Sequence, residues 1–135
     1  MIVVDSSFLI GFYNDRDAHH SVALDLMERF LAGTWGPGLL LEYVFLEIVT
    51  VLLMRRDISV ARRVGRLLLE SEELEFVPCS ELFVQTVADF SRQTLTALGF
   101  ADSAIALIAR ARAEGRILSF DAEFRKIAGL QVNPD

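Results

Sequence analysis

Four acidic residues stand in apolar sequence, where carboxylates are uncommon, and their types and spacing favour binding of a divalent cation. Asp5 and Asp121 each end an apolar run typical of a buried strand, and Glu47 and Asp102 lie on apolar segments with helical spacing. Gathered in one place, four carboxylates would repel one another, and their pKa values would rise unless a cation shared the site. Because hard oxygen ligands suit Mg²⁺ or Mn²⁺, we expect a metal site if the fold brings these residues together.

Strands alternate with helices along the chain, and this order decides whether the acids can meet. The predicted strands are at 2–4, 39–41, 75–78, 116–120 and 130–132; the predicted helices are at 8–13, from an Asp17 cap to before Gly33, at 42–56, from an Asp57 cap to Leu69, and at 80–98, 102–113 and 122–127. Such alternation implies right-handed βαβ crossovers and a short, mainly parallel sheet with helices on both faces. We therefore predict an α/β fold, one three-layer α/β/α domain over residues 1–135. Its ligands should bind beyond the carboxyl ends of the strands.

The composition indicates one globular domain with a large core and argues against other classes. The chain has 135 residues, a hydrophobic fraction of 53% and a formal net charge of −6. Glu42, Glu47 and Arg55 interrupt the richest apolar stretch, so no run reaches the roughly 20 residues of a membrane-spanning helix. No basic region precedes the first apolar residues, so we expect no secretory signal. Cys79, the only cysteine, has no disulfide partner, and a reduced cytoplasm fits best.

Basic residues are few but locally dense. Twelve of the thirteen are arginines, whose guanidinium binds phosphate or carboxylate in a bidentate fork. The acidic net charge argues against broad nucleic-acid binding, but five arginines lie close together at positions 55, 56, 62, 63 and 66. We expect a solvated helical face there, or contact with RNA or a partner protein, chiefly through Arg55, Arg56, Arg62 and Arg63.

Other conspicuous side chains are expected to be structural. His19 and His20 are adjacent, so their side chains point apart, and we expect them to be surface or capping residues. Phe83, Phe90 and Phe100 have the spacing of core or dimer packing rather than of a base-stacking platform.

The acidic motifs resemble those of the PIN-domain family, in particular its small VapC-type toxin ribonucleases. The resemblance rests on Val4-Asp5-Ser6-Ser7-Phe8, Tyr43-Val44-Phe45-Leu46-Glu47, Ala101-Asp102-Ser103-Ala104 and Ser119-Phe120-Asp121-Ala122-Glu123-Phe124, and it runs from residue 2 to about 132. Asp17 and His20 also match a common pattern of the family. Glu42 departs from it, because many relatives have Thr or another small polar residue there. An extra carboxylate near the site and a simple helix start are both open for Glu42.

The resemblance implies a Mg²⁺- or Mn²⁺-dependent endoribonuclease that hydrolyses RNA phosphodiester bonds. Asp5 and Asp102 would bind the metal directly, and Glu47 directly or through water. Asp121 would hold a water or a second, weaker ion. Ser6 or Ser119 would hydrogen-bond a carboxylate and fix its rotamer. For each acid, a purely structural role such as helix capping is the competing interpretation.

The resemblance also implies partners. Toxins of this kind form homodimers and are silenced by a small antitoxin whose tail covers the acidic groove, so we expect a homodimer, a cognate antitoxin and an RNA substrate. We expect no membrane partner.

Two other enzyme classes share the opening strand and Asp, and both fit poorly. A haloacid-dehalogenase-type phosphatase needs a second Asp where Ser7 stands. A receiver domain needs a late strand-end lysine, and the only lysine, Lys126, follows the Asp121 turn. The alternative of a different kind is a catalytically silent PIN-like module that binds RNA or protein.

Overall fold

A computed structural model describes residues 1–94 and 96–135. Within them, five strands form one parallel sheet in the order β3-β2-β1-β4-β5. The strands are β1 (Ile2–Val4), β2 (Gly38–Leu41), β3 (Leu74–Val77), β4 (Arg116–Leu118) and β5 (Gln131–Asn133). The predicted parallel sheet is therefore confirmed. The order reverses between β1 and β4, which is where open parallel sheets place their ligands.

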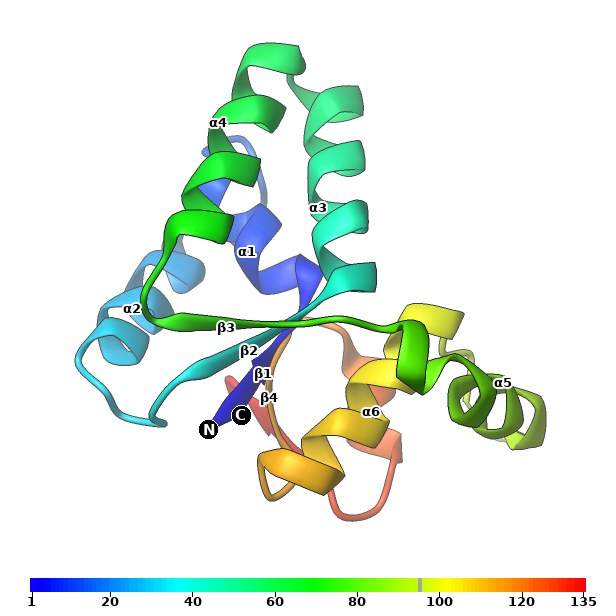
Figure 1. Cartoon of the computed structure of the whole chain (residues 1–135). Coiled ribbons are helices and arrows are strands. Elements are labelled where there is room, and N and C mark those ends of the chain that lie inside the picture. The colour runs from blue at the N-terminus through cyan, green and yellow to red at the C-terminus, as the bar shows by residue number, and fades with distance from the viewer. Residues whose placement is uncertain (95) are drawn as a thin grey trace.

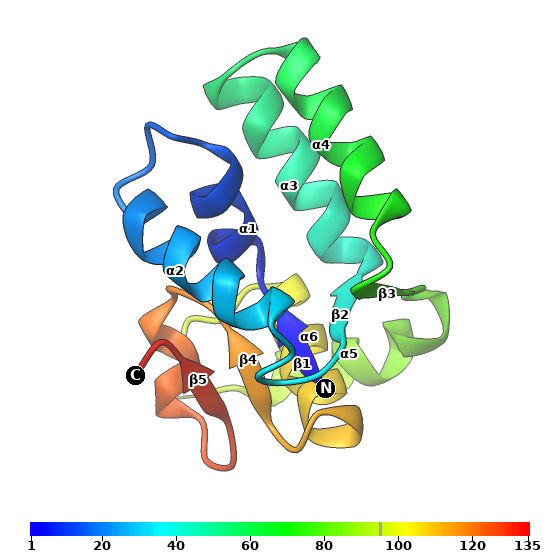
Figure 2. The same cartoon turned by 90° about the vertical axis from the view of Figure 1, so that its left-hand side faces the viewer.

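Helices cover both faces of the sheet, which confirms the predicted three layers. On one face lie α1 (Ser6–Tyr13), α2 (His20–Leu31), α3 (Glu42–Arg55) and α4 (Ile58–Glu70), and on the other α6 (Phe100–Arg112), with α5 (Phe83–Arg92) beside it (Figures 1 and 2). Short 3₁₀ turns, η1 (Ser80–Leu82) and η2 (Ala122–Lys126), complete the described elements. Helices α3 and α4 pack side by side as a hairpin above the sheet (Figure 1).

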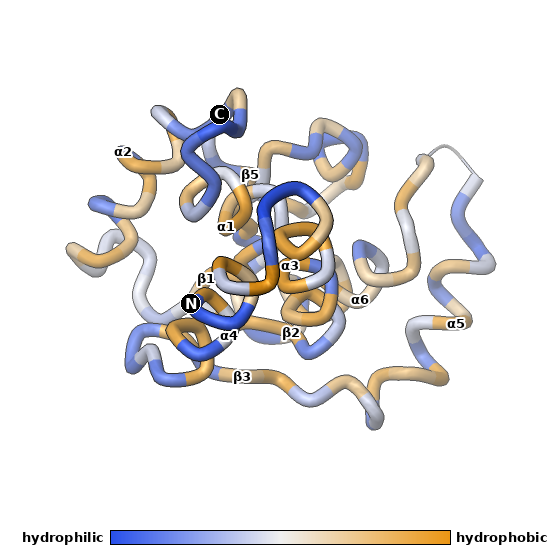
Figure 3. The backbone as a smooth tube through the Cα atoms, turned by 90° about the horizontal axis from the view of Figure 1, so that it is seen from above, coloured by the Kyte–Doolittle hydropathy of each residue, from blue (hydrophilic) through white to orange (hydrophobic). Residues whose placement is uncertain are grey.

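The apolar runs that predicted strands make the centre of the core. All three residues of β1 are fully buried, as are Leu39 and Leu41 of β2. Continuous apolar strands of this kind suit a parallel sheet that is covered on both faces. Seen along the perpendicular view, the apolar segments of β1 and β2 lie inside the molecule, and α5 lies at its edge (Figure 3). Each large side chain removed from water here contributes roughly 1.5–3 kcal/mol.

Two predicted features differ from the structure. The predicted helix at 80–98 is a 3₁₀ turn followed by α5, which ends at Arg92. Its amphipathic pattern continues past that point, but the side chain of Gln93 binds both backbone groups of Leu98 and so competes with helical hydrogen bonds. Leu95, within the same prediction, lies outside the described residues. Asp17 does not cap α2 directly: it accepts the backbone N–H of His19, and His19 is the cap residue.

Other boundaries agree closely with the prediction. Asp57 caps α4 by accepting the Val60 N–H at 2.9 Å, and Gly33, with φ of +84°, follows α2 as expected. Strand β4 ends at Leu118, two residues earlier than predicted, because Ser119 and Phe120 turn toward α1. No helix in residues 1–94 and 96–135 is both long and apolar enough to cross a membrane.

Candidate active site

Asp5 is the buried centre of the candidate site. It follows β1 directly, and its backbone N–H donates to the Leu118 carbonyl of β4 at 3.0 Å, so its position is fixed by the middle of the sheet. Only 3% of the residue is exposed. Burial raises the pKa of the Asp5 carboxyl above its ordinary value, and the charge of Asp121 raises it further, against hydrogen bonds from Ser119, Ser7 and the Ser6 backbone.

Two serine hydroxyls hold one oxygen of this carboxylate. Ser119 Oγ donates to Asp5 Oδ2 at 2.6 Å and Ser7 Oγ donates to the same atom at 2.8 Å. Each hydroxyl in turn accepts a backbone N–H at 2.9 Å, Ser119 from Asp121 and Ser7 from Phe120. Because each serine has one hydroxyl hydrogen and gives it to Asp5, their mutual distance of 3.2 Å reflects a shared acceptor. The other oxygen, Oδ1, has a weaker contact, with Ser6 Oγ at 3.5 Å.

Glu47 comes from the second turn of α3, which begins as soon as β2 ends. Val44, Ile48 and Leu52 of that helix are fully buried, which leaves Glu47 on the flank beside the sheet edge. The residue is exposed. Even so, partial desolvation and then the charges of Asp5 and Asp121 raise the pKa of its carboxyl, opposed by a hydrogen bond with Ser6. Glu47 therefore lies close enough to both aspartates for their charges to interact.

Asp102 lies in the first turn of α6, where its carboxylate Oδ2 accepts the N–H of the N-cap residue Gly99 at 3.1 Å. Burial and then the charge of Asp5 raise its pKa to about 7, with smaller contributions in the same direction from Asp121 and Glu47. The hydrogen bond from Gly99 opposes that rise. Asp102 is therefore both a helix cap and the group on which the charges of the other three acids converge.

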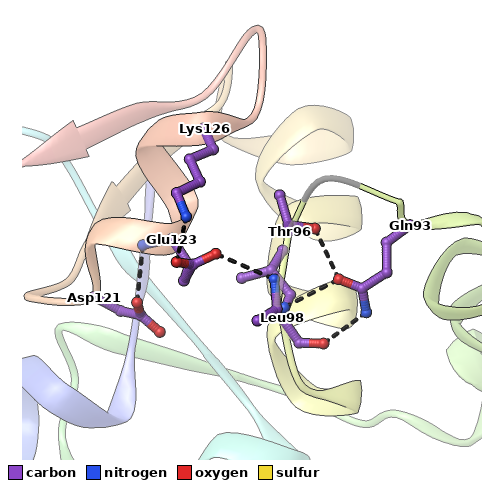
Figure 4. A network of polar contacts seen from close by, with 7 residues as sticks. Gln93, Thr96, Leu98, Asp121, Glu123 and Lys126 are labelled. Atoms are coloured by element: carbon purple, nitrogen blue, oxygen red, sulfur yellow. Dashed lines mark hydrogen bonds and ion pairs between the residues drawn. The ribbon is translucent and has the colours of Figure 1, made fainter.

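Asp121 is the N-cap residue of η2 and accepts the Glu123 N–H through Oδ1 at 2.9 Å. Glu123 in turn binds Lys126 and the Ala97 N–H, which joins η2 to the segment before α6 (Figure 4). Gln93 braces that segment through Thr96 and Leu98. These contacts fix the position of the segment that leads into α6, and so the position of Asp102 relative to Asp121.

The structure therefore places all four predicted acids at the carboxyl edge of the central strands, with coupled charges. Their oxygens are the donor set that suits a hard divalent cation, and an ion would offset the burial and the mutual repulsion that together raise the pKa values of Asp5, Glu47 and Asp102. By chemistry the residues fit such an ion. In the part of the chain that the structure describes, no three Asp, Glu, His or Cys side chains are grouped closely enough to form a ligand cluster as they stand.

The family model for the PIN domain matches residues 2–130. The chain belongs to the PIN-domain family. Among solved structures, VapC20 of Mycobacterium tuberculosis, a sarcin–ricin loop cleaving toxin, is similar with a TM-score of 0.84 and 22% identity, covering 99% of this chain and 100% of that chain. A toxin–antitoxin complex from Klebsiella pneumoniae is similar at a TM-score of 0.65 and 16% identity, covering 97% of this chain and 96% of the other. No curated protein matches the sequence significantly.

Other residues of this PIN domain singled out in the sequence have different surroundings. Glu42 accepts the Cys79 N–H at 2.9 Å, so it binds the segment just after β3, and it is not among the charges that raise the pKa values of Asp5, Glu47 and Asp102. Arg56 is bound to Asn14 and Asp15. Arg62 and Arg63 are exposed on α4.

Ser7 was not predicted as a site residue, although it binds Asp5 more closely than Ser6 does. Ser119 was predicted to orient a carboxylate, and its bond to Asp5 is the shorter of the two serine bonds to Oδ2. The sequence signal for Ser7 is its place beside Asp5 in Asp-Ser-Ser, which does not show which serine turns toward the carboxylate.

Proposed function

We propose that this PIN domain, acting as one unit over residues 1–135, is a Mg²⁺- or Mn²⁺-dependent endoribonuclease. The observation that carries the proposal is the convergence of charge on Asp102, whose pKa of about 7 reflects burial and the nearness of Asp5, Asp121 and Glu47. Structural ion-pair networks also perturb pKa values, but this group has a hydrogen-bond donor and no cationic partner among the causes of its shift. Such a cluster is suited to a cation.

In this proposal Asp5 and Asp102 hold the ion, Glu47 supports it directly or through water, and Asp121 orients a water or holds a second, weaker ion. A divalent ion bound there would offset the phosphodiester charge and lower the pKa of a bound water. The chain's own contribution is positional. Ser7 and Ser119 fix the rotamer of Asp5 through Oδ2 and leave Oδ1 for the ion.

We further propose that the protein is the toxin of a type II toxin–antitoxin pair, forms a homodimer and acts in the cytoplasm. Support comes from its similarity to VapC20, a toxin that cleaves RNA, and to a toxin–antitoxin complex. Exposed Phe83 and Phe90 pack with Phe100 on the outer side of α6, which is apolar surface of the kind a subunit interface buries. A monomeric mass by light scattering at micromolar concentration would count against the dimer.

The test is RNA cleavage by the purified protein in Mg²⁺, Mn²⁺ and EDTA, beside Asp5→Asn and Asp102→Asn. We expect metal-dependent cleavage that both variants lose. The matched control is Asp25→Asn, an exposed aspartate of α2, which should cleave normally. Cleavage that survives in both site variants would reject the assignment. Absence of both cleavage and any Mn²⁺-dependent melting shift would favour a silent binding module.

A further inference from the structure

A pocket of about 240 Å³ is lined by residues of α1 and α3 and by Asp17 and His19, and Glu47 is the one of the four acids that lines it. Its polar lining consists of Ser6, Ser7, Asp17, His19, Glu47 and Arg55. Glu47 and the two serines belong also to the candidate active site, so the pocket and the acids share a wall. A polymer whose scissile bond lies at the acids would therefore place the unit next to that bond in this pocket.

Arg55 brings positive charge to a pocket that otherwise contains two carboxylates. Its nearest acid is Asp17, at a long 3.9 Å, and 60% of the Arg55 side chain is exposed. An exposed pair of that length contributes little to stability, and most of the five guanidinium N–H donors stay available.

Arg56, the next residue, is more buried and more tightly bound than Arg55. Its side chain is 20% exposed, and its guanidinium donates to Asp15 at 2.8 Å and to Asn14 at 3.1 Å. Arg56 therefore anchors the segment that carries Asp17 and His19, whereas Arg55 is held loosely at the rim of the pocket. An arginine in that position is suited to bind a phosphate.

His19 brings an aromatic plane to the same pocket. Its imidazole is stacked on the Phe120 ring, with the centroids 4.3 Å apart and the planes 7° from parallel. The backbone N–H of His19 donates to Asp17 Oδ1, which fixes the backbone at this position. Gly11 leaves room for the stacked pair, because a Cβ at residue 11 would come within 3.3 Å of Phe120 and 3.5 Å of His19. Phe120 stacks on one face of the imidazole, and His19 is an exposed residue that lines the pocket.

We propose that this pocket binds the nucleotide next to the scissile phosphate, with Arg55 on its phosphate and His19 stacked on its base. The inference rests on the proposed ribonuclease function and deepens it. Single-stranded RNA is commonly held through stacking of bases on aromatic side chains, including His, combined with basic contacts to the backbone. The Asp17 side chain is 14% exposed and the Arg55 side chain 60% exposed, so in this scheme the phosphate binds the solvent-exposed part of the guanidinium. Arg55 and His19 are positioning residues in this scheme.

The test is binding of a short, fluorescein-labelled single-stranded RNA in EDTA, measured by anisotropy over a range of salt concentrations. Arg55→Gln should raise Kd about tenfold and make the slope of log K against log salt shallower by about 0.7, the value for one lost phosphate contact on a single strand. His19→Ala should raise Kd at least about fivefold with the slope unchanged, and His19→Phe should restore binding, because stacking needs an aromatic plane rather than a charge.

Arg66→Gln is the matched control, because Arg66 is an exposed arginine of the same helical hairpin and does not line this pocket. It should change neither Kd nor slope. Melting temperatures check that every variant is folded. Equal effects of Arg55→Gln and Arg66→Gln would overturn the proposal, as would failure of the unaltered protein to bind the RNA.

Cleavage assays on the same proteins separate this inference from the proposed function. If Asp5→Asn abolishes cleavage while Arg55→Gln and His19→Ala bind RNA normally, the nuclease stands and the pocket assignment falls. If the unaltered protein binds RNA through Arg55 and His19 but never cleaves it, the pocket stands and the nuclease falls.

Discussion

Asp102→Asn should stabilise the metal-free protein at pH 8. The Asp102 carboxyl has a pKa of about 7 in the folded chain and a reference value of 3.8. As pH rises from about 4, the unfolded state loses its proton first, so folding stability falls until about pH 7 and then stays level. A difference of about three units corresponds to a ceiling of about 4 kcal/mol. Asparagine removes the charge and keeps an oxygen that can accept the Gly99 N–H.

Asp102 is half-buried, so water screens part of this penalty, and we expect a gain of about 1–2 kcal/mol. For a domain of this size that is a rise in Tm of roughly 3–8 °C. The assay is thermal unfolding in EDTA at intervals between pH 5 and pH 8. The gain should be largest at pH 8 and shrink steadily toward pH 5. Asp25→Asn, the exposed control, should shift stability by less than about 0.5 kcal/mol.

Manganese should reverse the order of the melting temperatures, so that the unaltered protein becomes more stable than Asp102→Asn. Binding at 100 times Kd adds about 2.7 kcal/mol to the unaltered protein, and the variant, which lacks a proposed ligand, should gain far less. A lower Tm for Asp102→Asn at pH 8 in EDTA, or a gain that does not depend on pH, would refute the reasoning about coupled charge.

Further expectations concern the same site and one turn. Mn²⁺ affinity, measured by calorimetry, should fall about tenfold per pH unit below about pH 7, because Asp102 must lose its proton before it can bind; an affinity independent of pH would contradict this. Ser7→Ala and Ser119→Ala should each cost about 1.5–3 kcal/mol in urea unfolding at pH 8. The loss of unfolding free energy in the double variant should differ from the sum of the two single losses by at least about 0.5 kcal/mol, because both serines donate to the same oxygen of Asp5. Simple additivity would argue against the shared acceptor. Gly115→Ala should cost at least about 2 kcal/mol in the same assay, because φ is +80° and its Cβ would collide with the Gly129 carbonyl; Gly33→Ala, with φ +84° and open space, is the control and should cost less.

The sequence was sufficient to predict the fold, and the predicted acids lie near enough to one another for their charges to interact. Short β-branched or leucine-rich runs separated by helical periodicity have few topologies, and parallel strands bring their carboxyl ends to one edge. Asp5 and Asp121 could therefore be identified as candidate site residues from their positions at strand ends. Asp102 and Glu47 followed because each helix starts near that edge, as the structure shows for α3 directly after β2.

What could not be predicted depends on side-chain contacts across the chain. The place of Glu42 was open because its partner, the Cys79 N–H, lies 37 residues away. Ser7 and Ser6 are equivalent in the sequence, and only contacts with Phe120 and Ser119 distinguish them. The helix predicted over 80–98 was too long for a similar reason, because the hydrogen bonds of the Gln93 side chain to Leu98 replace helical hydrogen bonds there.

The central position of β1 has a consequence for the protein's own synthesis. Asp5 is translated well before its hydrogen-bond partner Ser119, which is 114 residues further along the chain, and β1 pairs with β4 only after that stretch has been made. A ribosome adds residues in one direction, so the emerging chain carries an unfinished carboxylate site while that stretch is being made. We expect a growing chain of this protein to lack the complete carboxylate site until β4 and Ser119 have left the exit tunnel.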